Sequence, residues 1–251
     1  MGYVCQLSEF WRKDEVTLNK AKGRMFKSVG WTWNPVAGCT HGCPYCWAKS
    51  LTERWGRSFE PQFREHFLKD KMPDDGSWIF VGSMGDIMCD GMKHEWIVKL
   101  IEFIDNYDGN NKFLLQTKNP SRFLYWQVET LLRHVQDKII VGTTFETNRK
   151  TFGIAPKPQE RYESMLWMKK QGYKIFLSLE PLSDFDATRF VSWINLLNPE
   201  AIEIGLENYT TFTTPPPEWK IHYLLNFLKS KGIEYVLKEN LRHLEETANE
   251  V

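Results

Sequence analysis

Short apolar runs recur along the chain from Trp78 onward, each followed by a polar, Gly or Pro stop and a helical stretch. Successive runs begin 34, 26, 35, 28 and 32 residues apart, which suits one strand and one helix in each repeat. Their apolar residues are continuous rather than alternating, as is typical of parallel strands buried on both faces. The expected strands are residues 78–82, 112–116, 138–142, 173–177, 201–205 and 233–237, with an earlier strand at 28–33.

Apolar residues at helical spacing lie between these runs. They predict helices at 94–104, 160–170, 186–197 and 218–230, another beginning at Ser121 after Pro120, and one near 48–55. This alternation predicts a single α/β domain across residues 28–240. Residues 1–27 are expected to form an N-terminal extension, 56–77 a cap-like insertion and 241–251 a polar tail.

Polar residues follow the carboxyl end of nearly every expected strand. A ring of polar side chains contributed by every strand is typical of the catalytic face of a barrel. An open doubly wound sheet would concentrate them at one switch point. We therefore expect a barrel, with these residues at its mouth: Ser83, Asp86, Gln116, Lys118, Thr144, Glu146, Ser178, Glu180, Glu207, Lys238 and Glu239.

The balanced charge argues against extended, non-specific binding to nucleic acid. Lys and Arg together number 32, and so do Asp and Glu, which gives a formal net charge of zero. No apolar run approaches the roughly 18–20 residues that a membrane span needs, and the first residues lack a basic-then-apolar secretory signal. We therefore expect a cytoplasmic protein with a small or local substrate and no membrane partner.

Three of the five cysteines fall within eight residues, in the sequence Cys39-Thr-His-Gly-Cys43-Pro-Tyr-Cys46. An odd number of cysteines is a poor disulfide framework in a reducing compartment. Three thiolates so close together can surround one metal centre, and soft thiolates suit zinc or an iron–sulfur cluster. A structural zinc needs a fourth ligand, for which His41, His66 and Cys89 are candidates. A [4Fe–4S] cluster on three cysteines would instead leave one iron open to a small molecule.

The C-x3-C-x2-C spacing, with Tyr45 before the last cysteine, resembles the signature of the radical S-adenosylmethionine (SAM) superfamily. Segments 33–39, 81–86 and 178–182 resemble an uncharacterised, phage-associated radical-SAM-like family, and strand ends 116–118 and 143–146 more distantly resemble spore photoproduct lyase-like proteins. The resemblance implies a single-domain partial (β/α)6-type TIM barrel with a [4Fe–4S] cluster and SAM as cofactors. The reduced cluster would cleave SAM to methionine and a 5′-deoxyadenosyl radical, which takes hydrogen from a substrate.

The resemblance also implies roles for individual residues. Cys39, Cys43 and Cys46 would hold the cluster, and SAM would contact Tyr45, Ser83, Asp86, Thr144, Glu146 and Ser178. Asp86 suits the SAM ammonium because a carboxylate accepts charge-assisted hydrogen bonds; the alternative is a helix N-cap. The candidates for the SAM carboxylate or the substrate are Lys118, Glu180, Glu207 and Lys238. Cys89 is either a thiol hydrogen donor or a small buried hydrophobic residue.

Three functions fit these features. The favoured one is a radical SAM enzyme that abstracts hydrogen from a nucleotide, nucleic acid or other small molecule. Its electrons would come from an external donor such as flavodoxin or ferredoxin. A radical SAM peptide-modifying enzyme is less favoured, because the chain has no cysteine-rich extension for auxiliary clusters. The third is a non-catalytic zinc-binding module.

Overall fold

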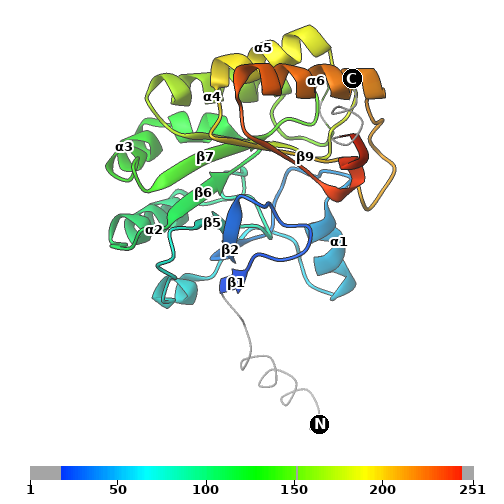
Figure 1. Ribbon diagram of the computed structural model, residues 1–251. Helices are drawn as coiled ribbons and strands as arrows, with labels where there is room; N and C mark the ends of the chain where they lie inside the picture. Colours follow the sequence, from blue (N-terminus) through cyan, green and yellow to red (C-terminus); the bar gives the residue numbers. More distant parts are fainter. Residues whose placement is uncertain (1–17, 151, 245–251) are drawn as a thin grey trace, which may run out of the picture.

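A parallel sheet that curls into an open half-barrel dominates the computed structural model, which describes residues 18–150 and 152–244 (Figure 1). The strand order is β1-β2-β5-β6-β7-β8-β9-β10, and every pair from β2 onward is parallel. The seven parallel strands are β2 (Val29–Trp33), β5 (Trp78–Val81), β6 (Lys112–Gln116), β7 (Ile139–Thr144), β8 (Ile175–Leu179), β9 (Ala201–Ile204) and β10 (Tyr235–Leu237). The expected barrel type is therefore confirmed.

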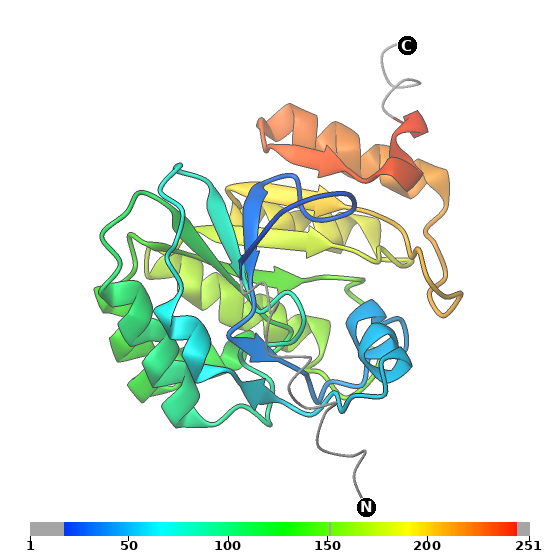
Figure 2. The ribbon, with the colours of Figure 1, turned by 90° about the horizontal axis from the view of Figure 1, so that it is seen from below.

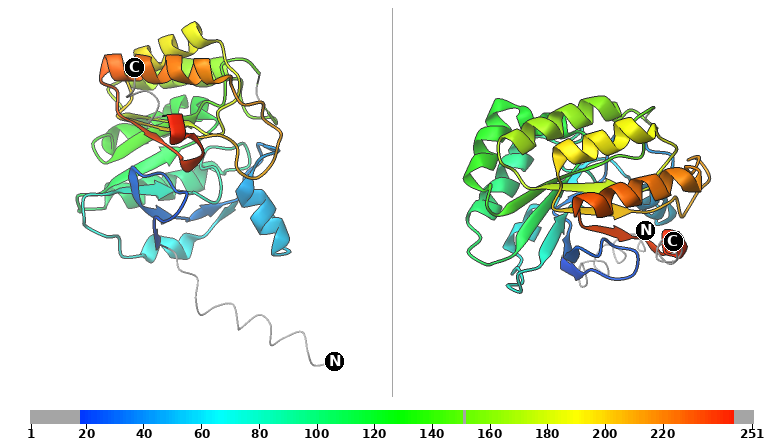
Figure 3. Two further views of the ribbon diagram at one scale, coloured as in Figure 1. Left: turned by 45° about the vertical axis from the view of Figure 1, so that its right-hand side comes forward. Right: turned by 45° about the horizontal axis from the view of Figure 1, so that its top comes forward.

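Five helices cover the outer face of this sheet, as Figures 2 and 3 show. They are α2 (His94–Asp105), α3 (Trp126–His134), α4 (Pro158–Lys170), α5 (Ala187–Leu197) and α6 (Glu218–Lys231). The sixth helix, α1 (Trp47–Arg54), stands apart from this layer, near the carboxyl ends of the strands (Figure 2). Each of the first six parallel strands is thus followed by a helix, and β10 adds a seventh strand. The main core lies between sheet and helices, where each buried aliphatic or aromatic side chain contributes about 1.5–3 kcal/mol.

Two predicted elements differ from the structure in their bounds. The helix expected from Ser121 is divided into a 3-10 turn, η3 (Pro120–Leu124), and the separate helix α3. Tyr125 has an extended backbone, and its carbonyl accepts hydrogen bonds from Val128 and Glu129, so the second helix begins anew there. Strand β8 begins two residues later than predicted and continues to Leu179, because Ser178 pairs with Thr144 of β7.

The expected cap-like insertion, residues 56–77, contains a short strand and a 3-10 turn. Strand β4 (Gln62–Phe63) pairs with β3 (Val36–Ala37), directly before the cysteine loop, and η2 (Glu65–Lys69) follows it. Within the expected polar tail, Leu241 of η4 (Glu239–Leu241) and Leu244 are both buried. Residues 245–251 of that tail, and residues 1–17 with Cys5, lie outside the described residues.

The described part of the expected N-terminal extension belongs to the barrel. Strand β1 (Leu18–Lys20) pairs antiparallel with β2, and the segment after it enters the barrel interior. There Phe26 lies 5.5 Å from the ring of Phe80 and 5.0 Å from that of Phe176. Two hydrogen bonds connect this segment to the opposite edge of the sheet. The Ser28 amide donates to Glu203 at 2.9 Å, and Lys238 donates to the Arg24 carbonyl at 3.0 Å.

Within the described ranges, no helix is both long enough and apolar enough to cross a membrane.

Candidate cluster and cofactor site

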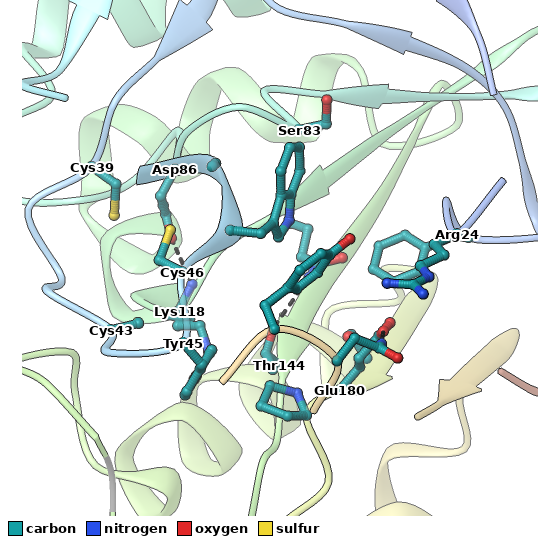
Figure 4. Close-up of a pocket in the computed structure, with 18 of the residues that line it drawn as sticks. Arg24, Cys39, Cys43, Tyr45, Cys46, Ser83, Asp86, Lys118, Thr144 and Glu180 are labelled. Carbon is teal, nitrogen blue, oxygen red and sulfur yellow. Dashed lines mark hydrogen bonds between the residues drawn. The ribbon is translucent and has the colours of Figure 1, made fainter. Parts of the chain in front are cut away.

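A cavity of about 420 Å³ opens at the carboxyl ends of the strands. Most of the polar strand ends expected at one mouth line this cavity: Ser83, Asp86, Gln116, Lys118, Thr144, Ser178, Glu180 and Glu207. Glu146, Lys238 and Glu239 were expected with them and do not line it. The three motif cysteines lie at one end, and Arg24 and Glu180 lie at the opposite end (Figure 4). A cavity of this volume falls within the range of ordinary ligand sites, about 300–1,000 Å³.

The cysteine loop reaches this mouth because two glycines allow close backbone approach. Gly38 and Gly85 form an isolated parallel bridge that joins the loop to the turn after β5. A Cβ on Gly85 would lie 2.5 Å from the Gly38 carbonyl oxygen, and one on Gly38 would lie 2.2 Å from the Glu60 carbonyl oxygen. Gly38 also has a φ of +82°, a conformation that side-chain-bearing residues rarely adopt. These glycines therefore set the position of Cys39, which follows directly.

The three motif thiols form a donor set that fits an iron–sulfur cluster. All three cysteines are half-buried and free, and Cys46 caps α1 by accepting from the Lys49 amide at 3.4 Å. Burial raises the pKa of the Cys46 thiol, so its thiolate form requires a compensating cation. A metal centre bound by the motif thiolates would supply that positive charge.

Cys39 also belongs to a second group of potential metal ligands. In the described ranges, Cys39, His41 and Asp86 each bring one ligand atom within 4.8 Å of the others. The Asp86 carboxylate in this group already accepts hydrogen bonds from His41 and Thr117. A single ion there would not engage Cys43 and Cys46, whereas a cluster of several metal ions can bind all three motif thiols.

The fourth zinc ligands considered from the sequence do not complete a zinc site with these thiols. His66 is exposed on η2 and does not line the cavity. His41 is buried and donates to Asp86 at 3.0 Å. Cys89 is fully buried, does not line the cavity, and shares a hydrogen bond with the Cys39 thiol. The thiol-donor role stays a prediction, and the alternative of a small buried hydrophobic residue agrees with the place of Cys89 in the core.

Asp86 joins the cysteine loop to two strand ends. One carboxylate oxygen accepts from Thr117 at 2.6 Å and the Met88 amide at 2.9 Å, and the other accepts from His41 and the Lys118 amide. Burial opposes ionisation, yet the hydrogen bonds from His41 and Thr117 hold the pKa of Asp86 below its ordinary value. The expected contact with the SAM ammonium stays a prediction, and it requires one of these four donors to move away.

Glu146 lies beneath the cavity in a buried charge network. Its carboxylate contacts Arg161 at 2.7 Å and, more closely, the Lys118 ammonium and the Tyr45 hydroxyl. Burial alone would raise the pKa of Glu146, but Arg161 and Lys118 hold it well below its ordinary value. Lys118 also donates to the Tyr45 hydroxyl at 2.7 Å and lies over its ring. The network therefore fixes Tyr45, the aromatic residue of the cysteine motif, to the barrel.

Three polar side chains remain directed at the middle of the cavity. Ser83 donates to Asn34 at 3.1 Å, Thr144 accepts from Gln116 at 3.1 Å, and Ser178 is buried beside Thr144. All of them line the cavity, whereas Glu146 does not. The expected contact between Glu146 and the ribose hydroxyls stays a prediction, and Thr144 and Ser178 are nearer to the open space.

The substrate-side candidates divide into two groups. Glu180 and Glu207 line the cavity, but the Glu207 carboxylate accepts from the Thr213 amide and hydroxyl, both at 2.7 Å. Burial raises the pKa of Glu180. Lys238 does not line the cavity; it lies below and pairs with Glu203 at 3.0 Å.

Sequence reasoning missed three residues that the structure brings to this site. Arg161 projects from α4 and is fully buried, and Thr117 follows β6. Arg24 lies in the segment assigned to an extension. Thr117 could have been predicted from its place directly after a strand, because the same feature identified Lys118 beside it. An arginine on a helix and one before the first strand carry no such local signal.

Comparisons with known proteins agree with this fold. The model of a family described as "Protein of unknown function (DUF5131)" matches residues 26–194, about two thirds of the chain. An uncharacterized protein, ORF301 of Acidianus two-tailed virus, is 24% identical over 176 residues, which cover 62% of this chain and 56% of the viral protein. The chain thus spans little more than half the length of that relative.

Several solved structures share the fold at low sequence identity. A spore photoproduct lyase mutant with dinucleoside spore photoproduct has a TM-score of 0.58 at 13% identity, covering 88% of this chain and 78% of that one. Streptococcus suis SuiB bound to the precursor peptide SuiA has a TM-score of 0.53 at 10% identity, covering 86% and 50%. A radical SAM methyltransferase from Sphaerobacter thermophilus has a TM-score of 0.51 at 12% identity, covering 85% and 67%. The chain therefore has the fold of radical SAM enzymes, and it belongs to the family described as a protein of unknown function (DUF5131).

Proposed function

We propose that this protein is a radical SAM enzyme that binds a [4Fe–4S] cluster through Cys39, Cys43 and Cys46. The observation that carries the proposal is the opening of all three motif thiols, which are free, onto one cavity at the carboxyl ends of the strands. When bound, the reduced cluster and SAM supply a 5′-deoxyadenosyl radical that removes a hydrogen atom from the substrate. The protein itself positions the cofactors and the substrate for this reaction.

The cavity residues suit a nucleoside-containing cofactor next to the cysteines. Thr144 and Ser178 offer hydroxyl groups on adjacent strands, and the Gln116 amide donates to Thr144, which leaves the Thr144 hydroxyl proton free for a ligand. The Lys118 ammonium faces the cavity within reach of a carboxylate. Trp47 and Phe59 line the cysteine end and reduce the access of water to it. We assign SAM to this middle section on these grounds.

The proposal also concerns partners and location. A thiolate-bound cluster requires a reducing compartment such as the cytoplasm, and its reduction requires an external electron donor such as flavodoxin or ferredoxin. The substrate class that we favour is a nucleotide or another small molecule. The alternative is a peptide-modifying reaction, because a structure with the same fold, SuiB, is bound to its precursor peptide.

The test is anaerobic purification and reconstitution of the full chain. We expect a brown protein with absorbance near roughly 400 nm and about four iron ions per chain. With reductant and SAM it should form 5′-deoxyadenosine, measured by liquid chromatography. Cys43→Ala should lose both iron and product, and Cys5→Ala, outside the motif, is the matched control. A colourless protein with one zinc ion, or wild-type SAM cleavage by Cys43→Ala, would contradict the proposal.

A further inference from the structure

The half of the cavity far from the cysteines carries two exposed cations. Lys22 and Arg24 lie on the segment between β1 and β2, and both line the cavity. The acidic residue at this end is Glu180, which pairs with Lys238 at 3.9 Å and whose ionised form is also favoured by the charge of Arg24. The cavity's other lysine, Lys118, is paired with Glu146. Because Glu180 is shared with Lys238, the rim keeps an excess of positive charge that attracts an anionic ligand.

Arg24 is held in place from two sides. Its guanidinium lies over the Tyr209 ring, 5.5 Å from the ring centre, and Tyr209 is 58% exposed at the same rim. Its carbonyl accepts from Lys238, which is buried and pairs with the buried Glu203 at 3.0 Å. An arginine fixed in this way loses little conformational freedom when it binds, unlike an ordinary surface arginine.

Aromatic rings and polar groups line the space inward from this rim. Phe26 and Phe80 are stacked at an angle of 29° and both face the cavity. Beside them, Glu180 offers carboxylate oxygens and the Asn208 amide lies 3.5 Å from one of these. Aromatic faces select a planar ring, whereas a carboxylate and an amide select the hydrogen-bonding edge of such a ring.

We propose that this far half of the cavity binds a nucleotide as the substrate of the radical SAM reaction. The phosphate contacts Arg24 and Lys22, the base lies against Phe26 and Phe80, and the edge of the base faces Glu180 and Asn208. A phosphate monoester carries the negative charge that the two cations require, and a guanidinium binds it through paired hydrogen bonds. This inference rests on the proposed function, because it names the substrate of the radical SAM reaction.

The experiment is direct binding by titration calorimetry, with the full reconstituted chain and SAM present and reductant absent. The probes are AMP, GMP, CMP, UMP and dTMP, the matching nucleosides, a single-stranded oligonucleotide, and an unmodified peptide of similar length. At least one mononucleotide should bind more tightly than its nucleoside, by about tenfold or more, because the nucleoside lacks the phosphate contacts. The oligonucleotide arm distinguishes a free nucleotide from a nucleotide within a strand.

Variants connect the binding to the residues. Arg24→Gln should weaken the binding of the preferred nucleotide about tenfold or more and leave nucleoside binding nearly unchanged. Lys27→Gln is the matched control, since Lys27 lies in the same segment, is exposed and does not line the cavity. Circular dichroism melting shows whether each variant is folded, and Arg24→Lys, which keeps the charge without the paired hydrogen bonds, should bind at an intermediate level.

Three results would overturn the inference: equal affinity for nucleotide and nucleoside, wild-type affinity in Arg24→Gln, or binding of the peptide alone. The outcomes also separate the two proposals. If 5′-deoxyadenosine forms but no nucleotide or oligonucleotide binds, only the substrate inference fails. If a nucleotide binds to a protein that holds no iron, the radical SAM function fails and the far half of the cavity is a nucleotide site without that reaction.

Discussion

Replacing Arg161 with methionine tests whether the buried network beneath the cavity is essential to the fold. The Arg161 side chain is fully buried, and it donates to Glu146 at 2.7 Å, to the Thr144 carbonyl at 2.9 Å and to the Pro156 carbonyl at 2.8 Å. Methionine fills similar space but donates no hydrogen bond. Glu146 would then retain only Lys118 as a charged partner.

The expected loss is about 3 kcal/mol in the free energy of unfolding. Removing one partner of a buried ion pair costs about 3–5 kcal/mol, and the remaining Lys118 places this case at the lower end. For a chain of this size, 1 kcal/mol corresponds to about 2–4 °C in Tm, so Arg161→Met should melt roughly 6–12 °C lower. Thermal unfolding followed by circular dichroism measures this shift.

Two further variants make the result specific. Lys99→Met is the matched control, because Lys99 pairs with Glu65 on the surface at 2.7 Å with 43% and 64% of the two side chains exposed, and such pairs contribute at most about 1 kcal/mol. Adding Glu146→Gln to Arg161→Met should recover part of the loss, since the buried negative charge is removed. The reasoning is refuted if Arg161→Met costs no more than Lys99→Met. It is also refuted if Glu146→Gln destabilises the Arg161→Met protein as much as it destabilises the wild type.

Three other outcomes follow from the same contacts. Gly85→Ala should reduce bound iron by at least half and lower Tm by several degrees, because its Cβ would lie 2.5 Å from the Gly38 carbonyl oxygen. Gly76→Ala is the control, and it should keep its iron because a Cβ there would meet no atom within 4 Å. Tyr45→Phe should lose about 1–2 kcal/mol of stability in thermal melts while the iron content is unchanged, because the hydroxyl bonds to Glu146 and Lys118 and the ring stays in place. Burial raises the pKa of Glu180, so the stability linked to its neutral form is present at low pH and is lost as pH rises through the raised pKa. Glu180→Gln should therefore gain Tm relative to wild type at about pH 8 and show no such gain at about pH 4; equal differences at both would contradict the assignment.

Much of the barrel was predictable because its signals are local. Continuous apolar runs at intervals of 26–35 residues indicated the parallel strands, and the residues after them indicated the mouth. Thr144 and Ser178 were correctly expected at one site, since adjacent parallel strands bring their carboxyl ends together. The helix from Ser121 was wrong in its continuity, because a break at Tyr125 depends on how η3 packs rather than on the apolar period.

The candidate site was predictable only in part. The three cysteines were identified by spacing alone, and the structure places all of them on the cavity. Lys238 was expected at the mouth, but it lies below and binds the Arg24 carbonyl, 214 residues away along the chain. Cys89 was a candidate thiol donor or a small buried hydrophobic residue, and its burial beside Cys39 agrees with the second of these.

The repeat of strand and helix, the polar strand ends and the three clustered thiols can all be recognised in the amino-acid sequence. These features depend on periodicity and short spacing, which act within a few residues. Which strand-end charges face the cavity and which are buried below it depends on long-range contacts in the folded chain. Glu146 is held by Arg161 and Lys118, 15 and 28 residues away, and Arg24 is held through Lys238. The reason is that a buried charge is stable only beside a partner, and the fold determines which partner is near.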